Sequence, residues 1–151
     1  MQLEDLEKDL LKIGSVVPNS DVQIVGGRRT KVLDLIRPSR ISIVNFWFLG
    51  CGGCMEELPE LQKIYAKVGA KSLGILPINR GDKAADIQTY WRKQKYSFAA
   101  IMAENKVHDA YQAYAYPTNY IVDAKGKILS RMIGYDHKRL VDALKKAGLR
   151  L

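Results

Sequence analysis

The sequence is poor in cysteine, with only Cys51 and Cys54 among 151 residues. Two cysteines cannot form the multi-disulfide framework of a small secreted domain. Their spacing, with two residues between them, is typical of redox pairs and of half a structural zinc site. Such a zinc site needs four ligands, and the only two histidines, His108 and His137, are isolated and distant in sequence. We therefore expect no bound metal.

Long hydrophobic runs are also absent from the sequence. No stretch approaches the ~20 apolar residues that a membrane-spanning helix needs. The first ten residues contain Glu4, Asp5, Glu7 and Asp9, and they lack the basic and apolar regions of a signal peptide. We expect any export signal or membrane tether to lie outside the sequence as given.

Negative charge is comparatively scarce, since 24 lysines and arginines against 16 acidic residues give a formal net charge of +8. Such an excess can favour anionic partners, but here the basic residues are scattered. Two groups of basic residues come nearest to a cluster: Arg28, Arg29, Lys31, Arg37 and Arg40, and Arg92, Lys93 and Lys95. Neither contains a recognisable nucleic-acid-binding motif, so we expect a solvated surface and no nucleic-acid partner.

The length and the 47% apolar composition predict one domain over 1–151, with 1–12 as an N-terminal extension. Short β-like runs alternate with segments of helical period, which favours an α/β fold. The predicted strands are 22–25, 30–33, 41–48, 72–78, 98–102, 118–122 and 127–133. Gly26 and Gly27 predict a hairpin between the first two strands, and 123–126 predicts one between the last two.

Three helices are expected between these strands, and a fourth is expected after the last strand. The first begins at the cysteines and carries its apolar side chains on one stripe: Cys54, Leu58, Leu61, Tyr65 and Val68. Pro59 lies inside it and should kink it. Asp82, Asn105 and Asp136 are the predicted N-caps of the other three helices. Their expected inner faces are Ile87, Tyr90 and Trp91; Val107, Ala110, Tyr111 and Tyr114; and Leu140, Val141 and Leu144.

The position of the two cysteines predicts their chemistry. Cys51 follows a buried strand and a turn at Gly50, and Cys54 lies in the first turn of the next helix. The unpaired N–H groups and the positive end of the helix dipole should stabilise a thiolate at Cys51, and such settings lower a cysteine pKa to roughly 3.5–7.5. We expect Cys51 to be the nucleophile and Cys54, on the core-facing stripe, to be the resolving thiol.

The sequence resembles the thioredoxin superfamily, and within it the TlpA/ResA-like thiol–disulfide oxidoreductases. The resemblance covers about 13–144 and is carried by Val44-Asn45-Phe46-Trp47, Cys51-Gly52-Gly53-Cys54, Glu57-Leu58-Pro59, Tyr116-Pro117-Thr118 and Ile121-Val122-Asp123 with Gly126. It implies a central mixed sheet with helices on both faces, an N-terminal β-hairpin and an inserted strand-helix element at about 82–102. It also implies a cis peptide bond before Pro117, packed against the dithiol.

The same resemblance implies a function: reduction of disulfides in protein substrates by the Cys51–Cys54 dithiol, without a cofactor. An upstream electron donor would then re-reduce the dithiol. Members of the family are mostly exported or membrane-tethered proteins of the bacterial envelope, so it implies a periplasmic or envelope location and a role such as cytochrome c maturation. Gly50 and the Gly-Gly spacer depart from the residues common in the family, which affects redox potential and substrate preference.

Several side chains near the dithiol are candidates for the site. Glu57 falls at the edge of the helix stripe, where a half-buried carboxyl near two thiols would have a raised pKa and could shuttle protons. The alternative is a rim carboxylate that complements the helix N-terminus. Trp47 either shields the dithiol or fills the core. With Tyr116, Pro117 and Thr118 it forms the predicted substrate-binding set.

Other polar and aromatic residues have simpler interpretations. Tyr111, Tyr114, Tyr116 and Tyr120 surround Pro117 and would form a docking face for a partner polypeptide, or each would simply be half-buried packing. We expect His108 and His137 to be surface or capping residues.

Two other functions remain open at this stage. A peroxiredoxin-like peroxidase normally has a Pro-x-x-x-Thr-x-x-Cys context, where this sequence has Val44 and Phe48. A copper-binding chaperone of the same fold would use the dithiol as a metal ligand, usually with longer cysteine spacing and a distant histidine.

Overall fold

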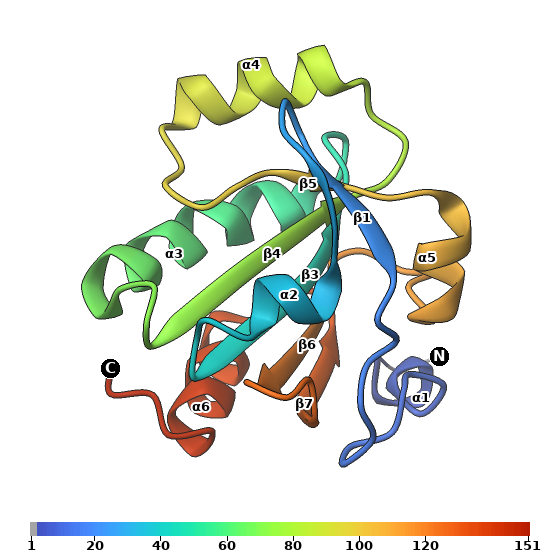
Figure 1. Cartoon of the computed structure of the whole chain (residues 1–151). Coiled ribbons are helices and arrows are strands. Elements are labelled where there is room, and N and C mark those ends of the chain that lie inside the picture. Colours follow the sequence, from blue (N-terminus) through green and yellow to red (C-terminus); the bar gives the residue numbers. More distant parts are fainter. Residues whose placement is uncertain (1–2) are drawn as a thin grey trace.

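A computed structural model describes residues 3–151 of the chain. It is built around one seven-stranded mixed sheet in the order β2-β1-β5-β4-β3-β6-β7 (Figure 1). The strands are β1 (Asp21–Ile24), β2 (Arg29–Lys31), β3 (Ile41–Trp47), β4 (Leu73–Asn79), β5 (Ile101–Met102), β6 (Thr118–Asp123) and β7 (Ile128–Ile133). The helices are α1 (Leu3–Glu7), α2 (Val32–Ile36), α3 (Gly52–Val68), α4 (Ala84–Gln94), α5 (Asn105–Ala110) and α6 (His137–Lys146).

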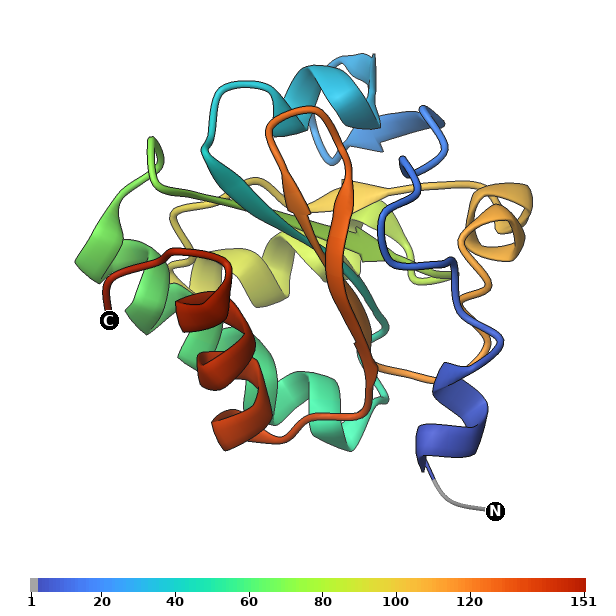
Figure 2. The ribbon, with the colours of Figure 1, turned by 90° about the horizontal axis from the view of Figure 1, so that it is seen from below.

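The helices cover both faces of the sheet, as the resemblance implied. One core contains side chains of α3, α4 and α6, among them Leu58, Ile87 and Leu140. The other contains Val32 and Ile36 of α2 and Val107 of α5. Figure 2 shows α3, α4 and α6 on one side of the strands and α2 on the other. The α/β, thioredoxin-like fold is confirmed.

The central strand β3 explains why the two cores are separate. All seven of its residues are buried, and successive side chains of a strand point to opposite faces. Ile43 and Trp47 therefore belong to the α3 core, and Val44 and Phe46 belong to the other. β3 runs parallel to β4 and antiparallel to β6. Because neither side of β3 is exposed, its sequence is the almost wholly apolar run from which the strand was predicted.

Two predicted strands are shorter than expected. The second hairpin strand ends at Lys31, and Val32 begins α2, where Asn19 Oδ1 accepts the Leu33 N–H at 2.9 Å. That bond satisfies one of the unpaired donors at the helix start. In the predicted strand 98–102 only Ile101–Met102 is a strand, although the Ala100 carbonyl still accepts the Val25 N–H at 2.9 Å. The Phe98 carbonyl accepts from Trp91 Nε1 at 2.8 Å rather than from a neighbouring strand.

Two of the three predicted N-caps are wrong. The residues before α4 and α5 are Lys83 and Glu104, and neither side chain makes a capping hydrogen bond. Asp82 instead accepts the Leu49 N–H and the Asn79 side-chain amide, and Asn105 is the first residue of α5. Asp136 does cap α6, since its Oδ1 accepts the Arg139 N–H at 3.2 Å.

The N-terminal extension is bound to the edge of the sheet. Glu7 Oε2 accepts the backbone N–H of Ile133 at 2.8 Å, and both carboxylate oxygens of Glu7 accept from Arg139. Arg131 Nη1 donates to the carbonyls of Leu10 and Leu11. The extension therefore covers part of β7, which is the last strand of the sheet, and α1 and α5 lie at the same end of the molecule (Figure 1; Figure 2).

Candidate active site

The cysteine pair lies where β3 passes into α3. Cys51 is the N-cap of α3, and its Sγ accepts the Cys54 N–H at 3.2 Å. The two cysteines form a disulfide. Cys51 retains 6% exposure and Cys54 none, because the helix turns Cys54 toward the sheet while Cys51 stays at the helix end. In the reduced protein, the N-terminal N–H groups of α3 would stabilise a thiolate at Cys51.

The loop before Cys51 is fixed by the segment after β4. Asp82 Oδ2 accepts the Leu49 N–H at 2.7 Å and Asn79 Nδ2 at 2.8 Å. The Asp82 N–H in turn donates to Asn79 Oδ1 at 3.0 Å. In addition, the Arg80 N–H donates to the carbonyl of Trp47 at 3.0 Å. These four bonds fix the conformation of the loop that connects β3 to Cys51 at the start of α3.

Glu57 is buried on the inner face of α3, one turn beyond Cys54. Its side chain is 1% exposed. Asn45 Nδ2 donates to Oε1 at 2.7 Å, and Asn119 Nδ2 donates to Oε2 at 2.9 Å. Burial raises the pKa of Glu57 to about 7, although both amide donors act in the opposite direction. The raised pKa agrees with the sequence prediction, whereas the expected half-burial and the alternative of a rim carboxylate are wrong.

The two asparagines hold Glu57 from neighbouring strands. Asn45 of β3 and Asn119 of β6 are cross-strand partners, and Asn45 Nδ2 also donates to Asn119 Oδ1 at 2.8 Å. Within the described part of the chain, Asn45 Oδ1 has no hydrogen-bond partner. Both asparagines therefore present amide nitrogens to the carboxyl group, an arrangement that favours its ionised form because a carboxylate only accepts hydrogen bonds.

The Tyr116–Pro117 peptide bond is cis, as the resemblance implied. Pro117 lies against the spacer between the cysteines: a Cβ built on Gly53 would be 3.2 Å from Pro117 Cδ and 3.8 Å from Tyr135 Cβ. This close approach is possible because Gly53 has no side chain. Tyr116 is half-buried, and its ring meets Phe48 edge to face at 5.4 Å. Phe48 and Tyr116 thus join the loop before Cys51 to the loop before β6.

Two residues of the predicted substrate-binding set cannot contact a substrate through their side chains. Trp47 is fully buried against Tyr90 and Trp91, so of the two interpretations the structure favours core packing. Thr118 is also fully buried, and its hydroxyl donates to the carbonyl of Ala115. Of the set, Pro117 lies against the spacer between the cysteines, and Tyr116 packs on Phe48 in the loop before Cys51.

The structure also corrects the expectations for histidine and tyrosine. His108 is fully buried rather than at the surface, whereas His137 is exposed. Tyr111 and Tyr120 are fully buried, so the four tyrosines do not form one docking face. Tyr114 is 62% exposed.

Three residues near the site were not recognised from the sequence: Asn119, Asp82 and His108. Asn119 adjoins the buried apolar run Tyr120-Ile121-Val122 of β6, and a polar residue in a strand of this kind is the one pattern that could have marked it. The roles of Asp82 and His108 depend on partners from other elements and leave no such pattern. Among residues 3–151, no group of three or more His, Cys, Asp or Glu side chains is arranged to hold a metal ion.

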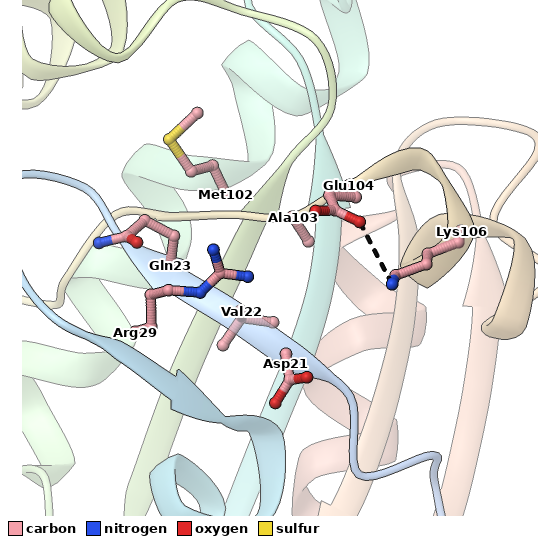
Figure 3. Close-up of a pocket in the computed structure, with 8 residues that line it drawn as sticks. All are labelled: Asp21, Val22, Gln23, Arg29, Met102, Ala103, Glu104 and Lys106. Atoms are coloured by element: carbon pink, nitrogen blue, oxygen red, sulfur yellow. Dashed lines mark ion pairs between the residues drawn. The ribbon is translucent and has the colours of Figure 1, made fainter.

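A pocket of about 300 Å³ lies on another part of the surface, over β1 and β5 (Figure 3). It is lined by Asp21, Val22, Gln23, Arg29, Met102, Ala103, Glu104 and Lys106. Its lining carries both signs of charge, and Lys106 pairs with Glu104 at 3.4 Å. Because neither cysteine lines it, this pocket is separate from the dithiol.

Comparison with known proteins gives consistent results. The model of the AhpC/TSA family matches residues 13–131. The chain is 24% identical over 137 residues to the thiol-disulfide oxidoreductase ResA of Bacillus cereus, covering 90% of this chain and 78% of that protein. It is 23% identical over 128 residues to ResA of Bacillus subtilis, covering 84% and 70%.

Solved structures share the fold. The thioredoxin domain of a thiol-disulfide oxidoreductase from Bacteroides vulgatus superposes with a TM-score of 0.77 at 24% identity, covering 90% of this chain and 97% of that one. A thiol:disulfide interchange protein of the thioredoxin family from Chlorobium tepidum gives a TM-score of 0.75 at 19% identity, with coverage of 91% and 97%.

Proposed function

Because the chain belongs to the AhpC/TSA family of thioredoxin-like proteins, we propose that it acts as a thiol–disulfide oxidoreductase on disulfide-containing proteins. The observation that carries this proposal is the Cys51–Cys54 disulfide at the start of α3, beside Pro117. The ResA relatives found by sequence support the same reaction.

The reaction consists of two exchange steps. The Cys51 thiolate attacks one sulfur of the substrate disulfide, the substrate S–S bond breaks, and the departing thiolate takes a proton. Cys54, as thiolate, then attacks Cys51 Sγ and releases the second substrate thiol. Two electrons pass from the dithiol to the substrate, and the Cys51–Cys54 disulfide remains. An upstream dithiol donor of the same exchange chemistry returns the pair to the reduced state.

Glu57 acts as the proton carrier of the second step in this proposal. Cys54 is fully buried and must lose its proton before it can attack, and Glu57 lies three residues later on the same helix face. A general base works best when its pKa is near the working pH, and the pKa of Glu57 is about 7. The protonated Glu57 can return the proton to a leaving thiolate. No cofactor is needed, since the dithiol itself carries the electrons.

The protein is proposed to work outside the cytoplasm, because disulfides persist in oxidising compartments. Within residues 3–151, no helix is long and apolar enough to cross a membrane. Labelling of the dithiol in intact cells by a membrane-impermeant maleimide would support this location. Labelling only after lysis would contradict it.

The central test is trapping of the exchange intermediate. Cys54→Ser removes the resolving thiol, so we expect a stable mixed disulfide between Cys51 and a substrate peptide, detected by mass spectrometry. Cys51→Ser should trap none. In the reduced wild-type protein, Cys51 should react with iodoacetamide before Cys54. Faster alkylation of Cys54 would reverse the two roles.

The two alternative functions are tested with the same material. Rapid consumption of hydrogen peroxide by the reduced protein, or stoichiometric tight binding of copper by the dithiol, would contradict the proposal if peptide disulfides were left unreduced.

A further inference from the structure

His108 is a buried titratable side chain that the reaction above does not use. It lies on α5, is fully buried, and packs edge to face on Phe46 at 5.4 Å. Nε2 lies 3.1 Å from the carbonyl oxygen of Asn79, and Nδ1 lies 3.3 Å from the hydroxyl of Tyr116. The imidazole therefore contacts two segments that both lead to the dithiol.

The hydrogen-bond partners of the His108 imidazole indicate which of its two nitrogens carries the hydrogen. Burial lowers the pKa of His108, so the neutral form predominates at neutral pH. A carbonyl oxygen can only accept, and therefore Nε2 carries the hydrogen and donates to Asn79. Nδ1 is then an acceptor that shares the single proton of the Tyr116 hydroxyl with the Ala113 carbonyl, which lies 2.9 Å from that oxygen, and the same oxygen accepts from Arg80 Nη1 at 3.1 Å.

Asn79 connects this contact to the cysteine loop. It is the last residue of β4 and is 1% exposed. Its carbonyl binds His108, and its side chain binds Asp82, which accepts the Leu49 N–H two residues before Cys51. On the other side of His108, Tyr116 directly precedes Pro117, which lies against Gly53.

We propose that His108 is a positioning residue for disulfide exchange, which fixes the Tyr116–Pro117 segment relative to the loop that carries Cys51. The proposal rests on the proposed function. A protein substrate must contact both segments while its sulfur aligns with Cys51, so a fixed relative position of the two reduces the ordering cost of binding. Arg80 contributes from the same β4 segment, because its backbone binds Trp47 and its side chain binds Tyr116.

The role predicts a specific kinetic pattern. His108→Phe keeps a ring against Phe46 but removes both polar contacts, and Tyr116→Phe removes only the hydroxyl. Each change should raise KM for a peptide disulfide about fivefold, the effect of one net hydrogen bond, with kcat nearly unchanged. Alkylation of Cys51 by iodoacetamide should change less than about twofold, since one hydrogen bond to a remote loop leaves the helix end intact.

Three controls separate positioning from general stability. The double variant His108→Phe, Tyr116→Phe should be less impaired than the two single effects multiplied together, because the contact between His108 and Tyr116 is removed by either change and can be lost only once. Tyr114→Phe removes a hydroxyl two residues away on an exposed side chain and should leave KM unchanged. His108→Gln, whose amide can replace Nε2 toward Asn79, should recover part of the loss. If His108→Phe does not fold by circular dichroism, His108→Gln, which loses the contact with Tyr116 but can keep the one with Asn79, is compared with Tyr114→Phe in its place.

The outcomes distinguish this inference from the function on which it rests. An active wild-type protein whose KM is unaffected by Tyr116→Phe, or whose single-variant effects simply add, would overturn the role of His108 alone. Exchange and Cys51 alkylation that slow in parallel would also overturn it, since that pattern indicates a distorted helix end. A wild-type protein that reduces no peptide disulfide would overturn the proposed function.

Discussion

Asn119 donates from Nδ2 to Glu57 Oε2 at 2.9 Å, joining two residues 62 positions apart. The bond crosses from the middle of the sheet to the inner face of α3, where Glu57 is 1% exposed. It favours the ionised carboxylate, whereas burial favours the protonated form. The balance between these two effects sets the pH range in which Glu57 can exchange a proton.

Removing the Asn119 donor should shift that balance. In Asn119→Ala, the pKa of Glu57 should rise by about one unit or more, because a hydrogen bond to a charged group contributes about 1.5–3 kcal/mol. The pH profile of peptide disulfide reduction should move to higher pH by the same amount. Asn105→Ala, at an exposed asparagine, is the matched control. An unmoved profile would show that Glu57 does not govern the rate.

Glu57 should also make stability depend on pH. Its pKa is about 7 in the folded protein against a usual 4.5, so between these values the folded state binds the proton more tightly than the unfolded state. The free energy of unfolding should therefore fall as pH rises through this window, by about 3 kcal/mol, and stay low above it. Glu57→Gln should abolish this loss.

The measurement is chemical denaturation of the oxidised protein at pH 5 and pH 8. Relative to wild type, Glu57→Gln should be more stable at pH 8 than at pH 5. Glu56→Gln, an exposed neighbour, should follow the wild-type curve. Parallel curves for Glu57→Gln and wild type would contradict the raised pKa.

Asp82 should be important for stability although it caps no helix. Asp82→Ala leaves the Leu49 N–H and the Asn79 side-chain amide without their acceptor. Because unpaired donors of this kind are costly, we expect a loss of about 2–3 kcal/mol of unfolding free energy. Asp86→Ala on the exposed start of α4 should lose no more than about 0.5–1 kcal/mol. Equal losses for Asp82→Ala and Asp86→Ala in equilibrium denaturation would show that the bonds from Asp82 to Leu49 and Asn79 contribute little to stability.

The N-terminal extension should be held by Glu7. Glu7→Ala removes the acceptor of the Ile133 N–H and the bidentate partner of Arg139. Since the Glu7 side chain is only 13% exposed, we expect a loss of about 1–2 kcal/mol. Asp5→Ala, which breaks only the exposed pair with Lys8, should cost less than about 0.5 kcal/mol. Hydrogen exchange of the Ile133 amide provides a local readout, and unchanged protection would contradict the prediction.

The pattern of the sequence predicted much of the architecture because it depends on local rules. Strand β3 was recognisable from an almost wholly apolar run, and α6 from its apolar spacing and the Asp136 cap. These signals arise because strand and helix periods bring neighbouring residues to one face. The predicted cap at Asp82 failed for the opposite reason: its side chain binds Leu49 and Asn79 and is no longer available to its own helix. At Asn105 the prediction missed the helix start by one residue, since Asn105 is already the first residue of α5.

The sequence by itself determined the dithiol and its place at a helix start, because residue type, spacing and strand-to-helix order are written along the chain, whereas Pro117 beside the dithiol followed from the resemblance to the family. Only the tertiary structure decided that Glu57 is fully buried between Asn45 and Asn119, and that His108 lies between Asn79 and Tyr116. The physical reason is that burial and hydrogen bonding depend on groups brought together from distant elements. The same carboxyl or imidazole at the surface would have its ordinary pKa.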